Sequence, residues 1–573
     1  MKNKLKFIVL SLCLLSLTFA CEDMLKTEMD HYKDTDGFEL NSPNDTLYSM
    51  VGIMRKMQSL ADRYVIVGEL RGELMDITEN ANMDLQAIAN FDFGLTDKNP
   101  LINTKEYYDI INNCNFFIQR ADTVGTALGK SVMAKELAAV KTIRAWVYMQ
   151  LVLNYGKACY YDEPILTVED VNKIKNNPAA WISDLTELRS RVERSLQEAL
   201  AVQTAFGNPS YSGISYIENA FLPASLVLGD LYLYTDAPAL AVVQYHNYLY
   251  SKRLQANSRM HYWIDPGFTG WNNNYNDQDL ITVIYTTTEN ETGSQLLSWC
   301  LPTEWSSLTG INCTYQLKPS KESMNIWDSQ YYAYLPANAT PQDEPVYTTG
   351  DLRSAPRIAY TYTANDYPPF DIGAIFNSYR YFSAAESDSL PFIAKYGGES
   401  GNDKVSISYI YRGGPLYLRY AEALNRMGKP SLAFAILKYG PSNQVFTDPE
   451  KVNPEEVTPL PEYCNFPEVI FPVVRQIGLH SRGSGSSERN SYYVFPETCV
   501  TLADSIRFVD ERICDELAME TAYEGNRFHD LMRFARYYGN EFLATRVARR
   551  QGSENAALKT KLMNEKNWYL PHN

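Results

Sequence analysis

The sequence is poor in basic side chains: its 573 residues include 52 Lys and Arg against 68 Asp and Glu, which gives a formal net charge of −16. A surface that binds nucleic acid must neutralise phosphates with basic side chains, so we expect no nucleic-acid partner. After its first twenty residues the chain also has no apolar run of about eighteen residues, the length that a membrane-spanning helix requires. We therefore expect no transmembrane segment in that part of the chain.

Sequence motifs for catalysis and cofactor binding are missing as well. The chain has no H-E-x-x-H zinc motif, no G-x-S-x-G nucleophile motif, no Walker loop and no dinucleotide-binding fingerprint. Its six histidines are scattered along the chain. These absences predict that the protein is not an enzyme and that it holds no cofactor; the sequence leaves calcium binding open.

The N-terminus predicts export and lipid attachment. Three lysines and an apolar stretch precede Ala20 and Cys21, an arrangement typical of a secretory signal over 1–20. A cysteine directly after the cleavage point resembles the lipidation box of bacterial lipoproteins, in which Cys21 would carry the lipid. An acidic and polar tether is expected to follow over 21–42.

The remaining cysteines do not form a disulfide framework. Of nine cysteines, one lies in the predicted signal and one is Cys21, which leaves an odd number, with no C-x-x-C pair among them. A chain of this size that is 45% hydrophobic can bury a large core without disulfides. We expect mostly buried thiols, with at most one incidental disulfide.

Apolar residues spaced by three and four predict helical hairpins in the two outer parts of the chain. The first hairpin covers 104–156, and Gly156 is expected to end its second arm. The second covers 215–252, where Pro238 suits a first helical turn and Pro223 marks either a kink or the true start of the first arm. Two more units are expected at 416–437 and 506–538.

Recurrent helix–turn–helix units with alanine on the packing face resemble tetratricopeptide repeats. We therefore expect a mainly α protein. A first helical repeat region is predicted over 43–252 and a second over 411–573, with a loop insertion at 438–500. Within that insertion, the glycine-serine patch over 482–487 is expected to be a flexible loop.

The middle of the chain, 253–410, has a different composition. It holds five of the eight tryptophans among many Asn, Gly, Pro and Thr residues, and it shows little helical period. A short strand is expected at 281–286. Since this stretch is too long for a bare loop, we expect an irregular, loop-rich lobe with short strands, packed on the helices and carrying the ligand site.

Four segments, in this order along the chain, resemble the SusD/RagB family of outer-membrane nutrient-binding lipoproteins. They are CEDML at 21–25, YYDIINNCN at 107–115, LRYAEALNRMG at 418–428 and DELAMETAYEGNRFHDLMRF at 515–534. We expect the last segment to be structural, since Glu524 and Arg527 can pair on one helix face. Arg419 and Glu422 are likewise expected to support packing.

The resemblance implies a tetratricopeptide-like helical half, a looped half that bears the ligand site, and no catalytic residues. It also implies a lipid-anchored protein on the outer face of the outer membrane. There the protein would act as a lid on a SusC-like TonB-dependent transporter and capture oligosaccharide for import. Because one branch of the family handles peptides, a peptide-binding importer component is an alternative. A structural lid without its own ligand specificity is another.

A glycan-binding site combines aromatic faces with amide and carboxylate hydrogen-bonding groups. The best local match lies at 271–277, with the candidates Trp271, Asn273, Tyr275 and Asp277. Further aromatic candidates are Trp299, Trp305 and Trp327. The resemblance implies that the segment before the first repeat also contributes, which adds Arg71, Asp76 and Asn80.

Overall fold

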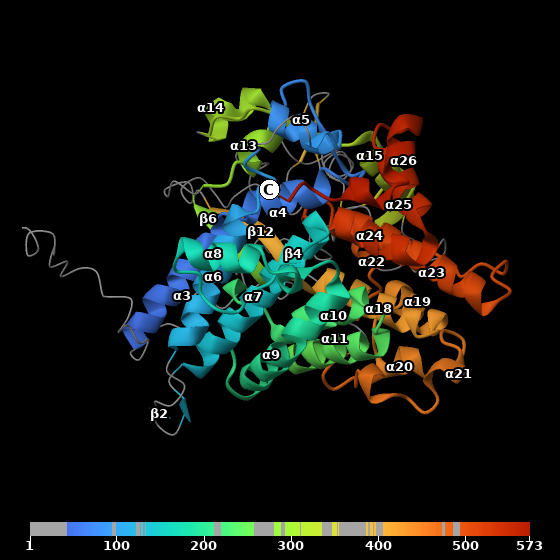
Figure 1. Ribbon diagram of the computed structural model, residues 1–573. Helices are drawn as coiled ribbons and strands as arrows, with labels where there is room; N and C mark the ends of the chain where they lie inside the picture. The colour runs from blue at the N-terminus through green and yellow to red at the C-terminus, as the bar shows by residue number, and fades with distance from the viewer. Residues whose placement is uncertain are drawn as a thin grey trace, which may run out of the picture.

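The computed structural model describes the greater part of the chain after residue 42. The described residues are 43–93, 99–121, 126–127, 130–131, 133–210, 219–256, 280–287, 293–309, 311–334, 346–351, 353, 385–387, 390–393, 395–396, 405–472, 476–484 and 493–572. Within these residues helices predominate and the strands are short (Figure 1), so the protein is mainly α, as predicted.

Each long helix of the repeat regions packs on the next one along the chain. The first series consists of α6 (Lys105–Arg120), α7 (Ala134–Tyr155), α9 (Leu185–Phe206), α10 (Ala224–Tyr234) and α11 (Pro238–Lys252). The second consists of α18 (Gly413–Arg426), α19 (Pro430–Lys438), α23 (Leu502–Glu520) and α24 (Arg527–Tyr538). Helix α11 packs on α18, so the two series form one stack of helices (Figure 1).

The predicted hairpin boundaries have clear physical causes. Gly156 ends α7 in the left-handed conformation, with φ of 70°. Pro223 is the residue before α10, so it marks the true start of that helix and does not kink it. Pro238 occupies the first turn of α11, where its missing N–H costs no helical hydrogen bond.

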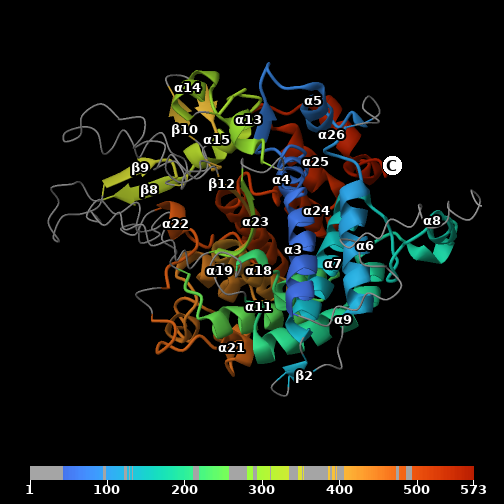
Figure 2. The same cartoon turned by 90° about the vertical axis from the view of Figure 1, so that its left-hand side faces the viewer.

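Outside the lobe and the insertion at 438–500, several helices are not among the predicted units. They are α3 (Pro43–Gln58), α4 (Ala61–Glu69), α5 (Met83–Ala89), α8 (Val168–Lys175), α9, α25 (Asn540–Ala548) and α26 (Ala556–Leu562). Helix α4 is buried at every residue except Asp62, so it has no solvent-facing polar stripe to reveal its period. Helix α8 has no buried residue and projects from the body at the right of Figure 2.

The described strands of the middle part are short, as expected, and pair in twos. β6 (Leu280–Thr287) pairs antiparallel with β12 (Val405–Arg412), which confirms the strand predicted at 281–286. The other pairs of this lobe are β8 (Tyr331–Tyr334) with β9 (Val346–Thr349) and β10 (Ala385–Ser387) with β11 (Leu390–Phe392). Because β12 leads directly into α18, the lobe is continuous with the helical stack. The structure does not test the boundaries predicted for the lobe at residues 253 and 410.

The insertion at 438–500 contains the short helices α20 (Asn443–Phe446), α21 (Pro454–Val457) and α22 (Ser481–Ser484). The flexible loop predicted at 482–487 is therefore wrong for its first residues. Arg482 is fully buried, with a guanidinium nitrogen 2.6 Å from a carboxylate oxygen of Glu520. A Cβ on Gly483 would lie 2.1 Å from a carboxylate oxygen of Asp351, so a larger residue there would have to displace that buried carboxylate.

The C-terminal segment at 515–534 forms a buried junction and is structural, as expected, but the predicted pair between Glu524 and Arg527 is wrong. Helix α23 ends at Glu520 and α24 begins at Arg527, so the two side chains do not share a helix. Glu524 instead pairs with Arg412 at 2.7 Å and with Lys395 of the lobe. Arg527 pairs with Glu73, which joins the C-terminal helices to the N-terminal segment.

Arg419 and Glu422 have the structural role expected of them. Arg419 pairs with Asp230 of α10 at 2.8 Å, and Glu422 pairs with Arg533 of α24 at 2.8 Å. Both ion pairs are buried, so they fix how α18 sits between its neighbours.

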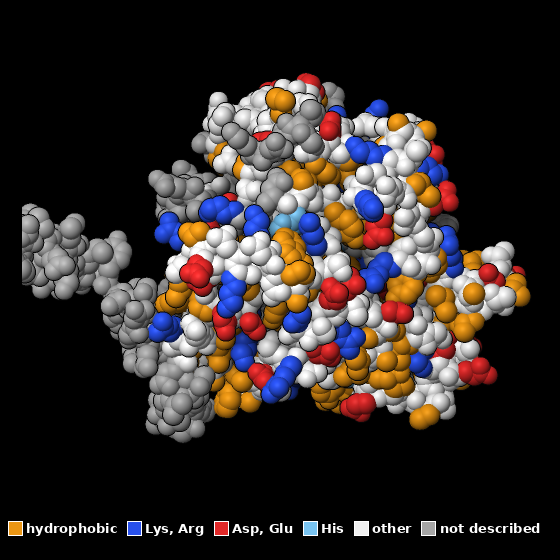
Figure 3. All heavy atoms as spheres, in the orientation of Figure 1, with side chains coloured by type: hydrophobic (Ala, Val, Ile, Leu, Met, Phe, Trp, Pro, Cys, Tyr) orange, Lys and Arg blue, Asp and Glu red, His pale blue; other side chains and the backbone are white. Residues whose placement is uncertain are grey.

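The described cysteines are free thiols; all are buried except Cys499, which is half-buried. On the face shown in Figure 3, Lys and Arg side chains are interspersed with Asp and Glu. Across the described ranges, no helix has the combination of length and apolar character needed to cross a bilayer.

Candidate ligand-binding site

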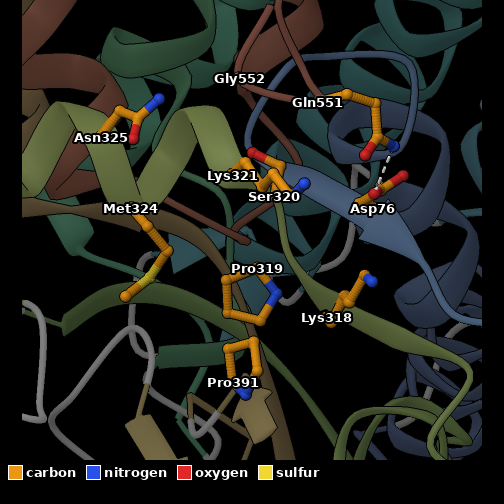
Figure 4. Close-up of a pocket in the computed structure, with 10 residues that line it drawn as sticks. All are labelled: Asp76, Lys318, Pro319, Ser320, Lys321, Met324, Asn325, Pro391, Gln551 and Gly552. Carbon is orange, nitrogen blue, oxygen red and sulfur yellow. Dashed lines mark hydrogen bonds between the residues drawn. The ribbon is translucent and has the colours of Figure 1, made fainter. Parts of the chain in front are cut away.

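A pocket of about 430 Å³ lies where the N-terminal segment, the lobe and the C-terminal helices meet (Figure 4). Its walls come from β1 (Met75–Ile77), β7 (Leu317–Pro319), β11, the first turns of α15 (Lys321–Asp328) and the turn after α25. The lining residues are Asp76, Lys318, Pro319, Ser320, Lys321, Met324, Asn325, Pro391, Gln551 and Gly552.

The pairing of β1 with β7 sets one wall. The two strands are antiparallel, and Asp76 lies directly opposite Lys318. Side chains alternate between the two faces of a strand, so the fully buried Met75 and Leu317 point to the core, while the opposed pair Asp76 and Lys318 faces the pocket. Asp76 is 4% exposed, which makes it a nearly buried carboxylate at the pocket wall.

Helix α15 supplies a second wall. Ser320 caps its N-terminus by accepting a hydrogen bond from the Ser323 N–H at 2.9 Å, and its own hydroxyl donates to the Glu73 carbonyl. Lys321, Met324 and Asn325 are spaced by three and four residues, so they share one helix face, and all three line the pocket.

Trp327 of the same helix lies in the core, 1% exposed, with its ring centroid 6.2 Å from that of Tyr523. This packing fixes the rotation of α15 about its axis. It therefore determines which side chains of the helix reach the pocket.

The turn after α25 closes the pocket from the C-terminal side. Arg550 is buried and donates to the carbonyls of Leu70 and Gly72, which attaches the turn to the N-terminal segment. The Gln551 side-chain N–H donates to Asp76 Oδ2 at 2.6 Å (Figure 4).

Burial lowers the pKa of Arg550 from its ordinary value. Gly552 has a φ of +79°, and a Cβ on it would lie 3.2 Å from Lys321 Cβ. A larger residue at this position would therefore strain the backbone and press on the lysine stem.

The structure places only one of the predicted site residues, Asp76, on this pocket. Two of the others are near it. The exposed Asn80 reaches the pocket only through Tyr315. Its side-chain N–H donates to the Tyr315 carbonyl at 3.4 Å. The Tyr315 hydroxyl donates in turn to the carbonyl of the pocket residue Pro391 at 2.7 Å. Trp305 contacts Phe392, next to Pro391, with centroids 4.9 Å apart.

Three predicted site residues lie in packing positions, away from the pocket lining. Arg71 is 0% exposed and donates to the carbonyls of Val67 and Trp568 at 2.8 Å, which leaves it no surface for a ligand; burial lowers its pKa to about 9. Trp327 is part of the core described above, and Trp299 is half-buried against the core. Trp271, Asn273, Tyr275, Asp277 and Cys21 lie outside the described residues.

Sequence reasoning missed most of the pocket, including Lys318, Lys321, Asn325 and Gln551. None of them belongs to a motif, and Gln551 meets Asp76 across 475 positions of sequence. The one local signal was the Ser320 cap, which marks the start of α15. His, Cys, Asp and Glu side chains within the described ranges form no group of three or more that could hold a metal ion.

Comparisons with known proteins agree on the fold. No protein-family model matches the sequence, and no curated protein sequence matches it. A SusD superfamily protein from Bacteroides thetaiotaomicron VPI-5482 is 14% identical, with 92% of this chain and 95% of that chain covered at a TM-score of 0.55. One from Bacteroides vulgatus ATCC 8482 is also 14% identical, with 93% and 92% covered at a TM-score of 0.55.

A further B. vulgatus protein, described as a candidate sugar-binding protein, is 15% identical, with 87% of this chain and 88% of that chain covered at a TM-score of 0.52. The expected resemblance is therefore confirmed at the level of the fold.

Proposed function

We propose, from the premise that this chain has the SusD-like fold, that it captures an oligosaccharide and delivers it to a SusC-like TonB-dependent transporter. The pocket at Asp76 is the proposed capture site. The observation that carries the proposal is the convergence, in one pocket of about 430 Å³, of a nearly buried carboxylate, two side-chain amides and an apolar floor.

The chemistry of the lining suits a sugar. Pro319, Pro391 and Met324 offer apolar surface to the C–H groups of a sugar ring. Asp76, Asn325 and Gln551 offer acceptors and donors to its hydroxyl groups. A structural neighbour described as a candidate sugar-binding protein supports the same ligand class.

Calorimetry over a panel of oligosaccharides tests the capture step. Asp76→Ala should weaken the best ligand about tenfold or more, since a hydrogen bond to a charged group contributes about 1.5–3 kcal/mol. Gln551→Ala should weaken it about two- to tenfold, since a neutral hydrogen bond contributes about 0.5–1.5 kcal/mol. Glu79→Ala is the matched control, because Glu79 is an exposed carboxylate close in sequence but outside the pocket. Thermal unfolding of each variant separates loss of the site from loss of the fold.

Three results would contradict the proposal. Equal affinity of the Asp76 and control variants would remove the pocket from the capture step. Binding of peptides without any glycan would favour the peptide-importer alternative. Release of reducing sugar by the purified protein would show an enzyme.

The anchoring and delivery steps are tested in cells. We propose that Cys21 carries lipid and holds the protein at the outer face of the outer membrane. Cys21→Ala should shift the protein from the membrane fraction to the soluble fraction. Affinity capture of the lipidated protein should recover a TonB-dependent barrel as a stoichiometric partner, and its absence would contradict the delivery step.

A further inference from the structure

We propose that the sugar bound at the Asp76 pocket carries an anionic group, a carboxylate or a sulfate ester. This inference rests on the function proposed above and adds the chemical class of the ligand. It starts from the two ammonium groups of the lining, those of Lys318 and Lys321.

The two lysines are the charges of the described lining without an ion-pair or hydrogen-bond partner: Lys318 is half-buried and Lys321 is exposed. Among the described residues, neither ammonium group has a hydrogen bond or an ion pair with a partner, although Lys318 lies directly opposite Asp76 on the neighbouring strand. Asp76, the one carboxylate of the lining, is bound by the Gln551 amide at 2.6 Å. The lining therefore has two cationic groups and one anionic group.

The carboxylates next to the lining have partners of their own. Glu322 is hydrogen-bonded to the Asn325 side chain. Glu73, which lies behind the cap of α15, is paired with Arg527. Two amides in the first turn of α15 are occupied: the Glu322 N–H donates to the Arg550 carbonyl and the Ser323 N–H to the Ser320 hydroxyl. We therefore expect the two lysines to be the main groups that bind an anion in the pocket.

The local charge opposes the charge of the whole chain. With a net charge of −16, the protein repels anions at long range. Two lysines placed in one pocket repel each other, and an anionic ligand removes that repulsion by pairing with both. Gly552 supports the placement of Lys321 in the pocket. A Cβ on Gly552 would lie 3.2 Å from Lys321 Cβ, so the absence of a side chain there leaves room for the lysine.

The test uses ligand pairs that differ only in charge. Calorimetry compares oligogalacturonate with its methyl ester, and a sulfated oligosaccharide with its desulfated form, on the full chain. We expect the charged member of at least one pair to bind more tightly, and to lose affinity between 0.05 and 0.5 M NaCl, because salt screens exposed charges. The neutral member should show no such loss.

Lys318→Gln and Lys321→Gln should each weaken the charged ligand by up to about fivefold and leave its neutral counterpart unchanged. Lys173→Gln is the control, because Lys173 is an exposed lysine of α8 far from the lining. Equal binding of both members of each pair, with no effect of either pocket variant, would overturn this inference and leave the proposed function intact. Failure of every oligosaccharide to bind would instead overturn the proposed function.

Discussion

Replacement of Glu524 by glutamine should destabilise the protein strongly. Glu524 is 2% exposed and pairs with Arg412 and Lys395. Arg412 would keep Glu520 at 3.1 Å, but Lys395 would keep only the Ala522 carbonyl and no described carboxylate within ion-pair distance.

Removing one partner of a buried pair costs about 3–5 kcal/mol. Burial already lowers the pKa of Lys395, so this lysine can lose its proton, and we expect the lower end of that range. The measurement is the free energy of unfolding in urea.

Two further variants make this prediction specific. Glu511→Gln breaks an exposed pair with Arg507, whose side chains are 35% and 52% exposed, so it should cost less than about 1 kcal/mol. Adding Lys395→Met to Glu524→Gln removes the uncompensated charge and should recover much of the loss. If Glu524→Gln costs no more than Glu511→Gln, the buried junction is not held together as described.

The same pairing also has a functional consequence. Lys395 follows β11 by three residues, and β11 supplies Pro391 to the pocket. Loss of the Glu524 contact should therefore loosen the pocket wall and weaken ligand binding below the unfolding transition. Unchanged affinity in a destabilised Glu524→Gln variant would show that this wall is held by other contacts.

Three further predictions concern the core. Burial opposes ionisation of Glu516, but Arg353 lowers the pKa of this carboxyl group to about 2. The stability that the ionised Glu516 provides is therefore present above pH about 4.5 and is lost as the pH falls toward 2. Glu516→Gln should remove about 3 kcal/mol of this pH-dependent stability, measured as the free energy of unfolding at each pH. Gly68→Ala should cost at least about 3 kcal/mol in urea unfolding, because its Cβ would lie 1.8 Å from the Gly525 carbonyl oxygen, and a stable variant would contradict this close contact. Trp327→Ala should lower the free energy of unfolding by about 3–5 kcal/mol and weaken ligand binding, because α15 would move. A Trp327→Ala variant that is stable but no longer binds ligand would instead show that Trp327 contacts the ligand.

The helical hairpins could be predicted because each has a buried stripe and a polar face. The period of three and four residues survives in the sequence, and Gly156 and Pro238 mark ends that require their special backbone. Helix α9 carries the same signal at Leu188, Val192 and Leu196 and could have been found in the same way. Helix α4 could not, because burial on all sides erases the period.

The ion pairs and the pocket could not be predicted because they depend on which distant segments meet. Glu524 and Arg527 have the spacing of a helical pair, but the helix ends between them and each side chain finds a partner elsewhere. Asp76 became a candidate only through the family resemblance, and its partner Gln551 has no local signal. Residue type alone likewise does not distinguish a buried Arg71 from an exposed ligand contact.

The most direct test of the central claim is a crystal structure of the protein with the oligosaccharide that calorimetry selects. The claim predicts sugar density in the Asp76 pocket, with ring hydroxyls within hydrogen-bond distance of Asp76 or Gln551 and a ring face against Pro319 or Pro391. Ordered sugar at another surface of the protein, with this pocket empty, would contradict it.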